Sequence, residues 1–319
     1  MKDLSKLFEG GTLATQKKRK ATFYCICATL ALIAVMLVIL AVCGVVALVK
    51  NHTPSGPVEE EMQVSIGATV PATFDESQLY SGSLLLLDAT HKYQGKAEMI
   101  KLRDADSRPK TSTGGHAYSI LAKGATDELD FRGTAEAVDA LHLMIKEFYT
   151  ARGDDNLCVV NAFTNANADT LAPAYTSGTT FAFEYYFEFP GTPKTIHGVD
   201  KYSWIYTNAH KYGFINVDLA PSDEESGSNV FRYVGIPHAT YMKTKKLDLE
   251  GYLEELKSAT VENPLLTKSG KYTYASYYIP AGAEALVPAD YSYTVSGNNV
   301  DGYIVTAIIT KRANTQKAE

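Results

Sequence analysis

Residues 204–215 read Trp-Ile-Tyr-Thr-Asn-Ala-His-Lys-Tyr-Gly-Phe-Ile, and residues 231–239 read Phe-Arg-Tyr-Val-Gly-Ile-Pro-His-Ala. The first run completes a segment, Asp200–Tyr212, whose apolar side chains recur at helical spacing. Gly213 follows at once, and glycine commonly ends a helix because it adopts the left-handed conformation without strain. A second helix is predicted over Leu247–Leu256. This part of the chain is therefore expected to be largely helical.

The rest of the chain alternates between helical and strand patterns. Thr134–Tyr149 reads as an amphipathic helix, with Thr134 able to cap its start and Gly153 placed after its end. Strands are expected at Gly82–Asp88, Leu157–Val160, Phe181–Phe189, Lys271–Ile279 and Asp301–Ile309, with turn residues at Ser296–Asn299. The pattern predicts an α+β fold, in which a small antiparallel sheet carries packed helices.

A long apolar run precedes this domain. No charged residue occurs between Lys20 and Lys50, and a run of about 20 apolar residues is enough to cross a bilayer as a helix. Residues 21–49 are therefore predicted to form a single transmembrane helix. Residues 41–44, Ala-Val-Cys-Gly, could be read as a cleavage site, but the apolar run continues past them, which favours an anchor that is kept.

The basic cluster Lys17–Lys20 orients this span, because positively charged flanks stay in the cytoplasm. We expect residues 1–20 to be a cytoplasmic tail, 50–78 an exterior linker, 79–310 the extracytoplasmic domain and 311–319 a short tail. The formal net charge of −6 argues against nucleic acid as a partner. Cys158 is the one cysteine outside the apolar run and is expected to be an inert core thiol.

Residues 204–257, together with Ser296–Thr306 near the end, resemble VanY-type zinc D-alanyl-D-alanine carboxypeptidases. The resemblance extends over roughly residues 79–310 and implies the fold of these enzymes and a cell-wall peptide as substrate class. In such enzymes a strand ends in Ser-Gly-Tyr-Arg, and its Arg contacts the substrate. Asn161-Ala162-Phe163-Thr164 stands at that place, and Thr164 cannot offer the charged fork of an arginine.

The second family motif, Ser-x-His-x-x-Gly-x-Ala-x-Asp, supplies a His and an Asp to the zinc ion. Its best match ends at Phe181-Ala182-Phe183-Glu184, which puts Glu184 at the Asp position and Ser177 at the His position. Shifting the register by one or two residues brings in no histidine, because none lies between His142 and His197.

The third family motif, Glu-Pro-Trp-His, directly precedes Phe-Arg-Tyr-Val-Gly and provides the general base and another zinc ligand. The four residues here are Gly227, Ser228, Asn229 and Val230. Glycine cannot accept a proton and valine cannot bind a metal, whereas a catalytic zinc site needs about three protein ligands. The resemblance therefore implies no catalytic residue and no metal site in this chain, although active relatives use zinc.

Three hypotheses about function follow from this pattern. The first is a membrane-anchored, catalytically inactive domain that binds cell-wall stem peptide or an envelope protein. Its vestigial groove would be lined by Asn161, Thr164, Ser177, Glu184, Gly227 and Val230. The second is an active D,D-carboxypeptidase with a rearranged metal site. The third is a structural component of an envelope complex that assembles through its anchor helix.

Overall fold

The computed structural model describes residues 66–102, 130–165, 171–186, 191–217 and 228–309. All of them belong to one compact unit, Ser65–Glu319, while the other unit, Met1–Val64, lies outside the described residues. The predicted membrane helix, 21–49, and the predicted tail, 311–319, also lie outside them. Among the described helices, none is both long enough and apolar enough to cross a membrane.

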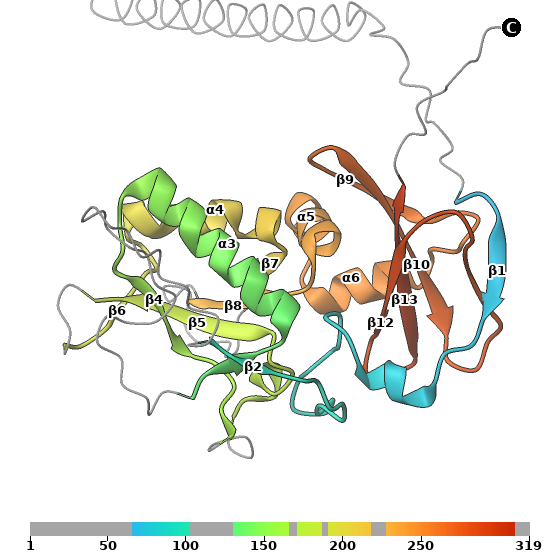
Figure 1. Ribbon diagram of the computed structural model, residues 1–319, viewed down its shortest axis with the longest axis horizontal. Helices are drawn as coiled ribbons and strands as arrows, with labels where there is room; N and C mark the ends of the chain where they lie inside the picture. Colours follow the sequence, from blue (N-terminus) through green and yellow to red (C-terminus); the bar gives the residue numbers. More distant parts are fainter. Residues whose placement is uncertain (1–65, 103–129, 166–170, 187–190, 218–227, 310–319) are drawn as a thin grey trace, which may run out of the picture. The chain divides into compact units, whose positions relative to one another are not determined.

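The first half of the domain is built on an antiparallel sheet with strand order β4-β5-β8-β7, in which β6 also pairs with β5. These strands are β4 (Leu157–Asn161), β5 (Thr180–Tyr185), β6 (Lys194–Thr195), β7 (Phe214–Asn216) and β8 (Val230–Tyr233). Helix α3 (Ala135–Arg152) lies along this sheet (Figure 1) and buries Val138, Leu141, Ile145 and Phe148 against it. The helix and its buried face are confirmed, and Gly153 ends the helix in the left-handed conformation.

The helix expected over Asp200–Tyr212 is divided into three short pieces. They are a 3-10 turn η5 (Asp200–Tyr202), helix α4 (Ser203–Asn208) and a second 3-10 turn η6 (Ala209–Tyr212). Ile205 and Ala209 are buried in the core of the first sheet, so the predicted apolar face is kept. Gly213, at φ +87°, ends the segment as expected.

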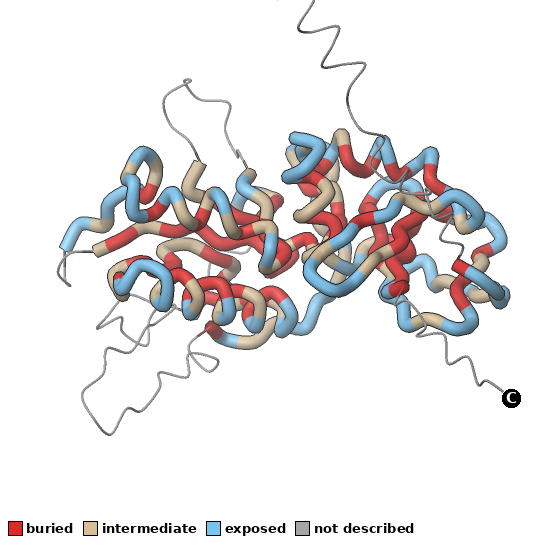
Figure 2. The backbone as a smooth tube through the Cα atoms, turned by 90° about the horizontal axis from the view of Figure 1, so that it is seen from above, coloured by how far each residue is buried: buried red, intermediate tan, exposed pale blue. Residues whose placement is uncertain are grey.

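The second half carries another antiparallel sheet, with strand order β12-β13-β10-β9. Its strands are β9 (Leu265–Ser269), β10 (Tyr272–Pro280), β12 (Tyr293–Gly297) and β13 (Gly302–Ile309). Helices α5 (Ile236–Lys245) and α6 (Leu249–Leu256) lie between the two sheets (Figure 1). In Figure 2 the buried residues follow the strands and the inner sides of the helices. The fold is thus a mixed α/β arrangement with two main sheets, where the sequence suggested one.

Smaller elements complete the unit. They are β1 (Thr69–Ala72) paired with β11 (Ala285–Pro288), β2 (Ile100–Lys101) paired with β3 (Arg132–Gly133), and the 3-10 turns η2 (Glu76–Tyr80) and η4 (Pro173–Tyr175). Because β1 precedes residue 79 and η2 begins before it, the folded unit includes residues that we expected to form the end of the linker.

The prediction of a strand at Gly82–Asp88 is wrong, although the segment is buried as its apolar residues indicated. Leu84 and Leu85 are almost completely buried. The backbone of this segment makes isolated hydrogen bonds, several of them to side chains, and does not pair with a neighbouring strand. Leu84 N–H donates to the Ser296 hydroxyl at 3.0 Å, and the Arg232 guanidinium donates to the Leu85 carbonyl. An apolar run can be buried in this way without joining a sheet, because what must be satisfied is each polar backbone group.

Candidate functional site

Three of the predicted groove residues, Asn161, Glu184 and Val230, lie on one face of the first sheet, the face away from α3. Side chains alternate between the two faces of a strand, so Phe181 and Phe183 enter the core under α3 while Ala182 points to the other side. Ala182 is paired with Asn161 of β4 and with Val230 of β8. Neighbouring side chains of this kind lie about 5 Å apart at Cβ. The sheet therefore brings Asn161, Ala182 and Val230 together.

The centre of this face is filled by an apolar cluster of Tyr175, Ala182 and Val230, with Val160, Leu171 and Val217 packed around it. Tyr175 is only 4% exposed. Burial raises the pKa of its phenol to about 12, against the effect of a hydrogen bond with the side chain of Asn161. The phenol therefore stays protonated at neutral pH. These side chains close the surface by packing against one another.

The other predicted groove residues lie in different places. Ser177 is buried, and its hydroxyl lies 2.8 Å from that of Thr179. It does not belong to the apolar cluster and borders a cavity described below. Thr164 is buried in the segment that follows β4. Gly227 lies outside the described residues.

Glu184 lies two residues beyond Ala182 on the same strand and is partly buried. Desolvation raises the pKa of its carboxyl above the usual value. Its strand partner Cys158 is buried, and burial together with the charge of Glu184 raises the pKa of the thiol to about 12. A thiol in this state is a poor nucleophile, which agrees with the expected core role of Cys158. Within the described part of the chain, no three His, Cys, Asp or Glu residues lie close enough to hold a metal ion.

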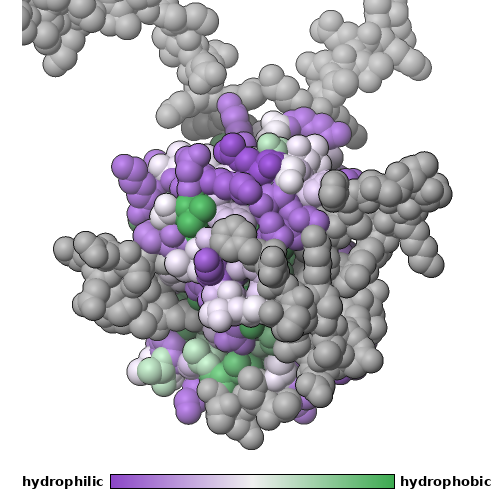
Figure 3. Space-filling view, turned by 90° about the vertical axis from the view of Figure 1, so that its left-hand side faces the viewer, coloured by the Kyte–Doolittle hydropathy of each residue, from purple (hydrophilic) through white to green (hydrophobic). Residues whose placement is uncertain are grey.

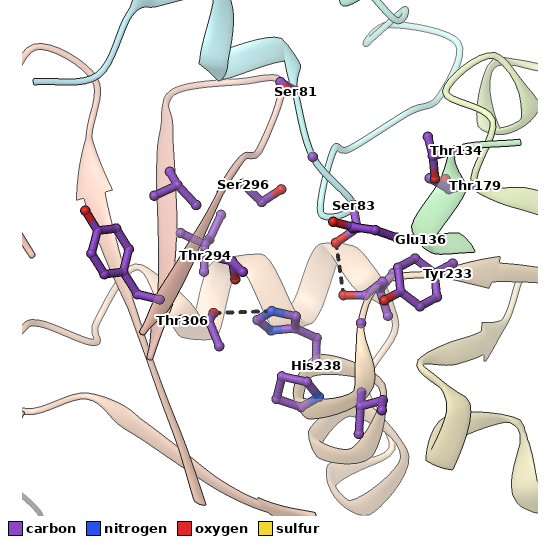
Figure 4. A pocket seen from close by; sticks show the side chains of 18 of the residues that line it. Ser81, Ser83, Thr134, Glu136, Thr179, Tyr233, His238, Thr294, Ser296 and Thr306 are labelled. Carbon is purple, nitrogen blue, oxygen red and sulfur yellow. Dashed lines mark hydrogen bonds between the residues drawn. The ribbon is translucent and has the colours of Figure 1, made fainter. Parts of the chain in front are cut away.

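A cavity of about 570 Å³ lies between the two sheets and is called the inter-sheet cavity here. One wall carries Thr134, Ser177, Thr179 and Tyr233 from the first half of the domain, and the opposite wall carries hydroxyl residues of β12 and β13 (Figure 4). The first turn of α5 and residues 81–83 complete the lining. No sequence pattern predicted this site, because its residues are spread from Ser81 to Ile308 and share no motif.

His238 closes the cavity on the side of α5. Its Nδ1 lies 2.7 Å from the Tyr252 hydroxyl and its Nε2 lies 3.3 Å from the Thr306 hydroxyl. Burial lowers the pKa of His238 to about 3, so the ring is neutral at physiological pH. These two contacts tie α5 to α6 and to β13, so His238 has a structural role in the cavity wall.

Comparisons with known proteins agree with the resemblance seen in the sequence. A scan against models of protein families finds no match for this chain. A curated D-alanyl-D-alanine carboxypeptidase of Enterococcus faecium is 28% identical over 272 residues, which cover 81% of this chain and 83% of that protein. The chain is homologous to this carboxypeptidase.

Among solved structures, the chain is similar to the vancomycin resistance D,D-dipeptidase VanXYg, crystallised with a D-Ala-D-Ala phosphinate analog. The TM-score is 0.59 at 18% identity, and the match covers 76% of this chain and 100% of VanXYg. The two proteins therefore share a fold, and residues 66–309 form a domain similar to D-alanyl-D-alanine carboxypeptidases.

Proposed function

We propose that this domain is a catalytically inactive relative of D-alanyl-D-alanine carboxypeptidases, which serves binding or regulation in the cell envelope. The observation that carries the proposal is the apolar cluster of Tyr175, Ala182 and Val230. Side chains that bind one metal ion must converge on a point about 2 Å from each of them. Tyr175, Ala182 and Val230 instead pack against one another in one buried cluster, so their own side chains fill the space in which an ion would have to lie.

The cluster also suggests which residues replaced the zinc ligands. If Gly178, which has φ +70°, occupies the glycine of the family motif Ser-x-His-x-x-Gly-x-Ala-x-Asp, the His position falls on Tyr175 and the Asp position on Ala182. This register is two residues earlier than the one that placed Ser177 and Glu184 there. It is favoured because Ala182 is paired directly with Val230, the position of the third ligand.

These residues do not fit a zinc ion. Alanine and valine have no donor atom, and a phenol held protonated by burial is a poor ligand. Without the metal, an attacking water keeps a pKa near 15.7 instead of about 7. The general base is also missing, since Gly227 stands at its place, and such a base contributes on the order of 10²–10⁴-fold to a rate. Independent losses of this kind support inactivity more strongly than any single one.

The direct test is to measure bound metal and D-alanine release from a pentapeptide ending in D-Ala-D-Ala with the full-length protein. We expect no stoichiometric zinc and no release above the uncatalysed background. Stoichiometric metal with chelator-sensitive turnover would instead establish the alternative, an active D,D-carboxypeptidase with a rearranged metal site.

A reconstructed site tests the register independently of activity. The triple variant Tyr175→His, Ala182→Asp, Val230→His should bind one zinc ion, detected by calorimetry. The matched control places the same residues according to the other register, as Ser177→His, Glu184→Asp, Val230→His. It should not bind zinc, because Ser177 does not lie in the cluster. If only the control binds zinc, the register that places the ligand positions at Tyr175 and Ala182 is wrong.

Location and partners are part of the same proposal. We place residues 21–49 across the cell membrane as a single-pass anchor, with 1–20 in the cytoplasm and the domain outside the membrane. The partner would then be a cell-wall stem peptide or an envelope protein. Reporter fusions at residues 20 and 60 test the orientation, since an externally active reporter should work only at the second position.

A further inference from the structure

The inter-sheet cavity is a second feature of the domain, distinct from the apolar cluster. Neither Tyr175 nor Ala182 nor Val230 lines it. Its volume of about 570 Å³ lies within the range of roughly 300–1,000 Å³ that small-ligand sites usually have. It can therefore be considered as a binding site whether or not the domain retains any peptidase activity.

Hydroxyl groups dominate the lining. They include Thr134, Ser177 and Thr179 on one wall and Thr294, Ser296 and Thr306 on the other (Figure 4). A hydroxyl both donates and accepts, so a row of them suits a ligand whose own groups do both. Ser177 and Thr179 are bonded to each other at 2.8 Å, which uses one of their two protons and leaves the other to donate.

Tyrosine rings supply part of the apolar lining, beside aliphatic residues such as Pro237 and Ile304. Tyr93, Tyr233, Tyr274 and Tyr293 all border the cavity. Burial, together with the charges of Glu136 and Tyr274, raises the pKa of Tyr233 to about 12, so its hydroxyl remains a donor at neutral pH. A tyrosine ring offers a flat apolar face and a polar end, which matches a molecule with apolar C–H faces and hydroxyl edges.

The charges that line the cavity are few. Of the described residues that border it, none is Lys or Arg, Glu136 is the only carboxylate, and His238 is neutral. A phosphate or a peptide carboxylate would find no cationic partner there. A carboxylate such as Glu136 can instead accept hydrogen bonds from two neutral hydroxyl groups at once.

We propose that the inter-sheet cavity binds a neutral saccharide, with tyrosine rings against the faces of the sugar and hydroxyls and Glu136 at its edges. The outer surface of the domain gives weaker evidence for a binding site. The face in Figure 3 is mostly hydrophilic, with separate hydrophobic groups, and nothing in the structure shows what would cover them.

The test is calorimetric titration of the full-length protein, in a detergent without a sugar head group, with a panel of neutral disaccharides. Maltose, cellobiose, lactose and N,N′-diacetylchitobiose serve as probes. We expect saturable binding of at least one probe. Its affinity should stay within about twofold between low and high salt, because a neutral sugar forms no ion pair that salt could screen. Failure of all four probes to bind at concentrations up to about 10 mM, a free energy near −3 kcal/mol, would overturn the proposal.

Two variants locate the binding. Thr294 is exposed on β12 at the cavity, so Thr294→Trp should fold and fill the space, weakening binding by tenfold or more. Leu266→Trp is the matched control: Leu266 is 40% exposed on β9 of the same sheet but does not border the cavity, and binding should be unchanged. If Thr294→Trp loses its circular dichroism spectrum, Ser292→Trp, also exposed at the cavity, replaces it.

Two further outcomes would contradict the proposal. If glucosamine binds, Glu136→Gln and high salt both remove that binding and no disaccharide binds, the cavity is an amine site. If a pentapeptide binds, Thr294→Trp removes that binding and no disaccharide binds, the cavity is a peptide site. Neither outcome depends on metal content or D-alanine release, so this proposal and the inactive-peptidase proposal can fail separately.

Discussion

Only Thr176 lies between Tyr175, which fills the apolar cluster, and Ser177, which lines the inter-sheet cavity. In the register proposed above, the cluster stands at the positions of the family's zinc ligands, and its side chains pack against one another. The cavity stands between the two sheets and keeps a polar, open lining. Under the two proposals above, one region of this fold lost its metal chemistry by gaining core packing, while a neighbouring region binds a ligand.

The largest expected difference between the two regions is in stability. Tyr175→Ala removes a ring that is 4% exposed, and truncating a buried aromatic residue typically costs about 3–5 kcal/mol. Thr294→Ala changes an exposed side chain at the cavity and should stay within about 0.5 kcal/mol. Urea unfolding followed by circular dichroism measures both. Equal, small losses would show that the cluster is an open groove and not part of the core.

A second difference concerns acid. In the folded state His238 has a pKa of about 3, below its ordinary value of 6.5, so the unfolded chain takes up the proton first as pH falls. Its contribution to stability is therefore present above about pH 6.5 and is lost progressively toward pH 3. Acidification from pH 7.5 to pH 5 should therefore lower the free energy of unfolding by about 2 kcal/mol through this residue alone.

The variant His238→Gln isolates this effect, because all other titrating groups remain. Its stability should change less between pH 7.5 and pH 5 than that of the native protein, whatever its absolute stability. Parallel curves for the two proteins would mean that the ring is not held neutral beside the cavity.

The sequence predicted the elements whose patterns are local. The helix around Val138 and Leu141 follows from apolar spacing, and the end of the segment at Gly213 follows from the conformational freedom of glycine. The Gly82–Asp88 run misled because an apolar pattern reports burial and not strand pairing. Some of its backbone partners lie far away in the chain, since the Ser296 hydroxyl that accepts from Leu84 is 212 residues away.

The candidate site was predicted only in part for the same reason. The family resemblance assigned Asn161, Glu184 and Val230 to one groove, and the sheet does bring them to one face. The position of Ser177 depends on the turn before β5, which the sequence alone does not locate. The cavity depends on how two sheets approach, and no local pattern in the chain reports that.

The smallest expected effect lies at the turn that divides the two regions. Gly178 has φ +70°, its N–H donates to the carbonyl of Tyr175 at 3.0 Å, and its carbonyl accepts from Thr134 at 2.9 Å. A Cβ at this position would lie 2.7 Å from the Met99 sulfur, the flexible end of a side chain that can move. Gly178→Ala should therefore cost about 1–2 kcal/mol, mainly for the left-handed backbone.

Gly198→Ala is the matched control for this prediction. Gly198 has φ +73°, but a Cβ there would meet nothing within 4 Å, so the backbone cost is shared and the contact with Met99 is not. The two variants should lose similar stability in urea unfolding. Only Gly178→Ala should also weaken disaccharide binding, by a few fold, since it displaces the turn that carries Ser177 and Thr179 into the cavity. If both variants bind sugar as the native protein does, this turn does not set the geometry of the cavity wall.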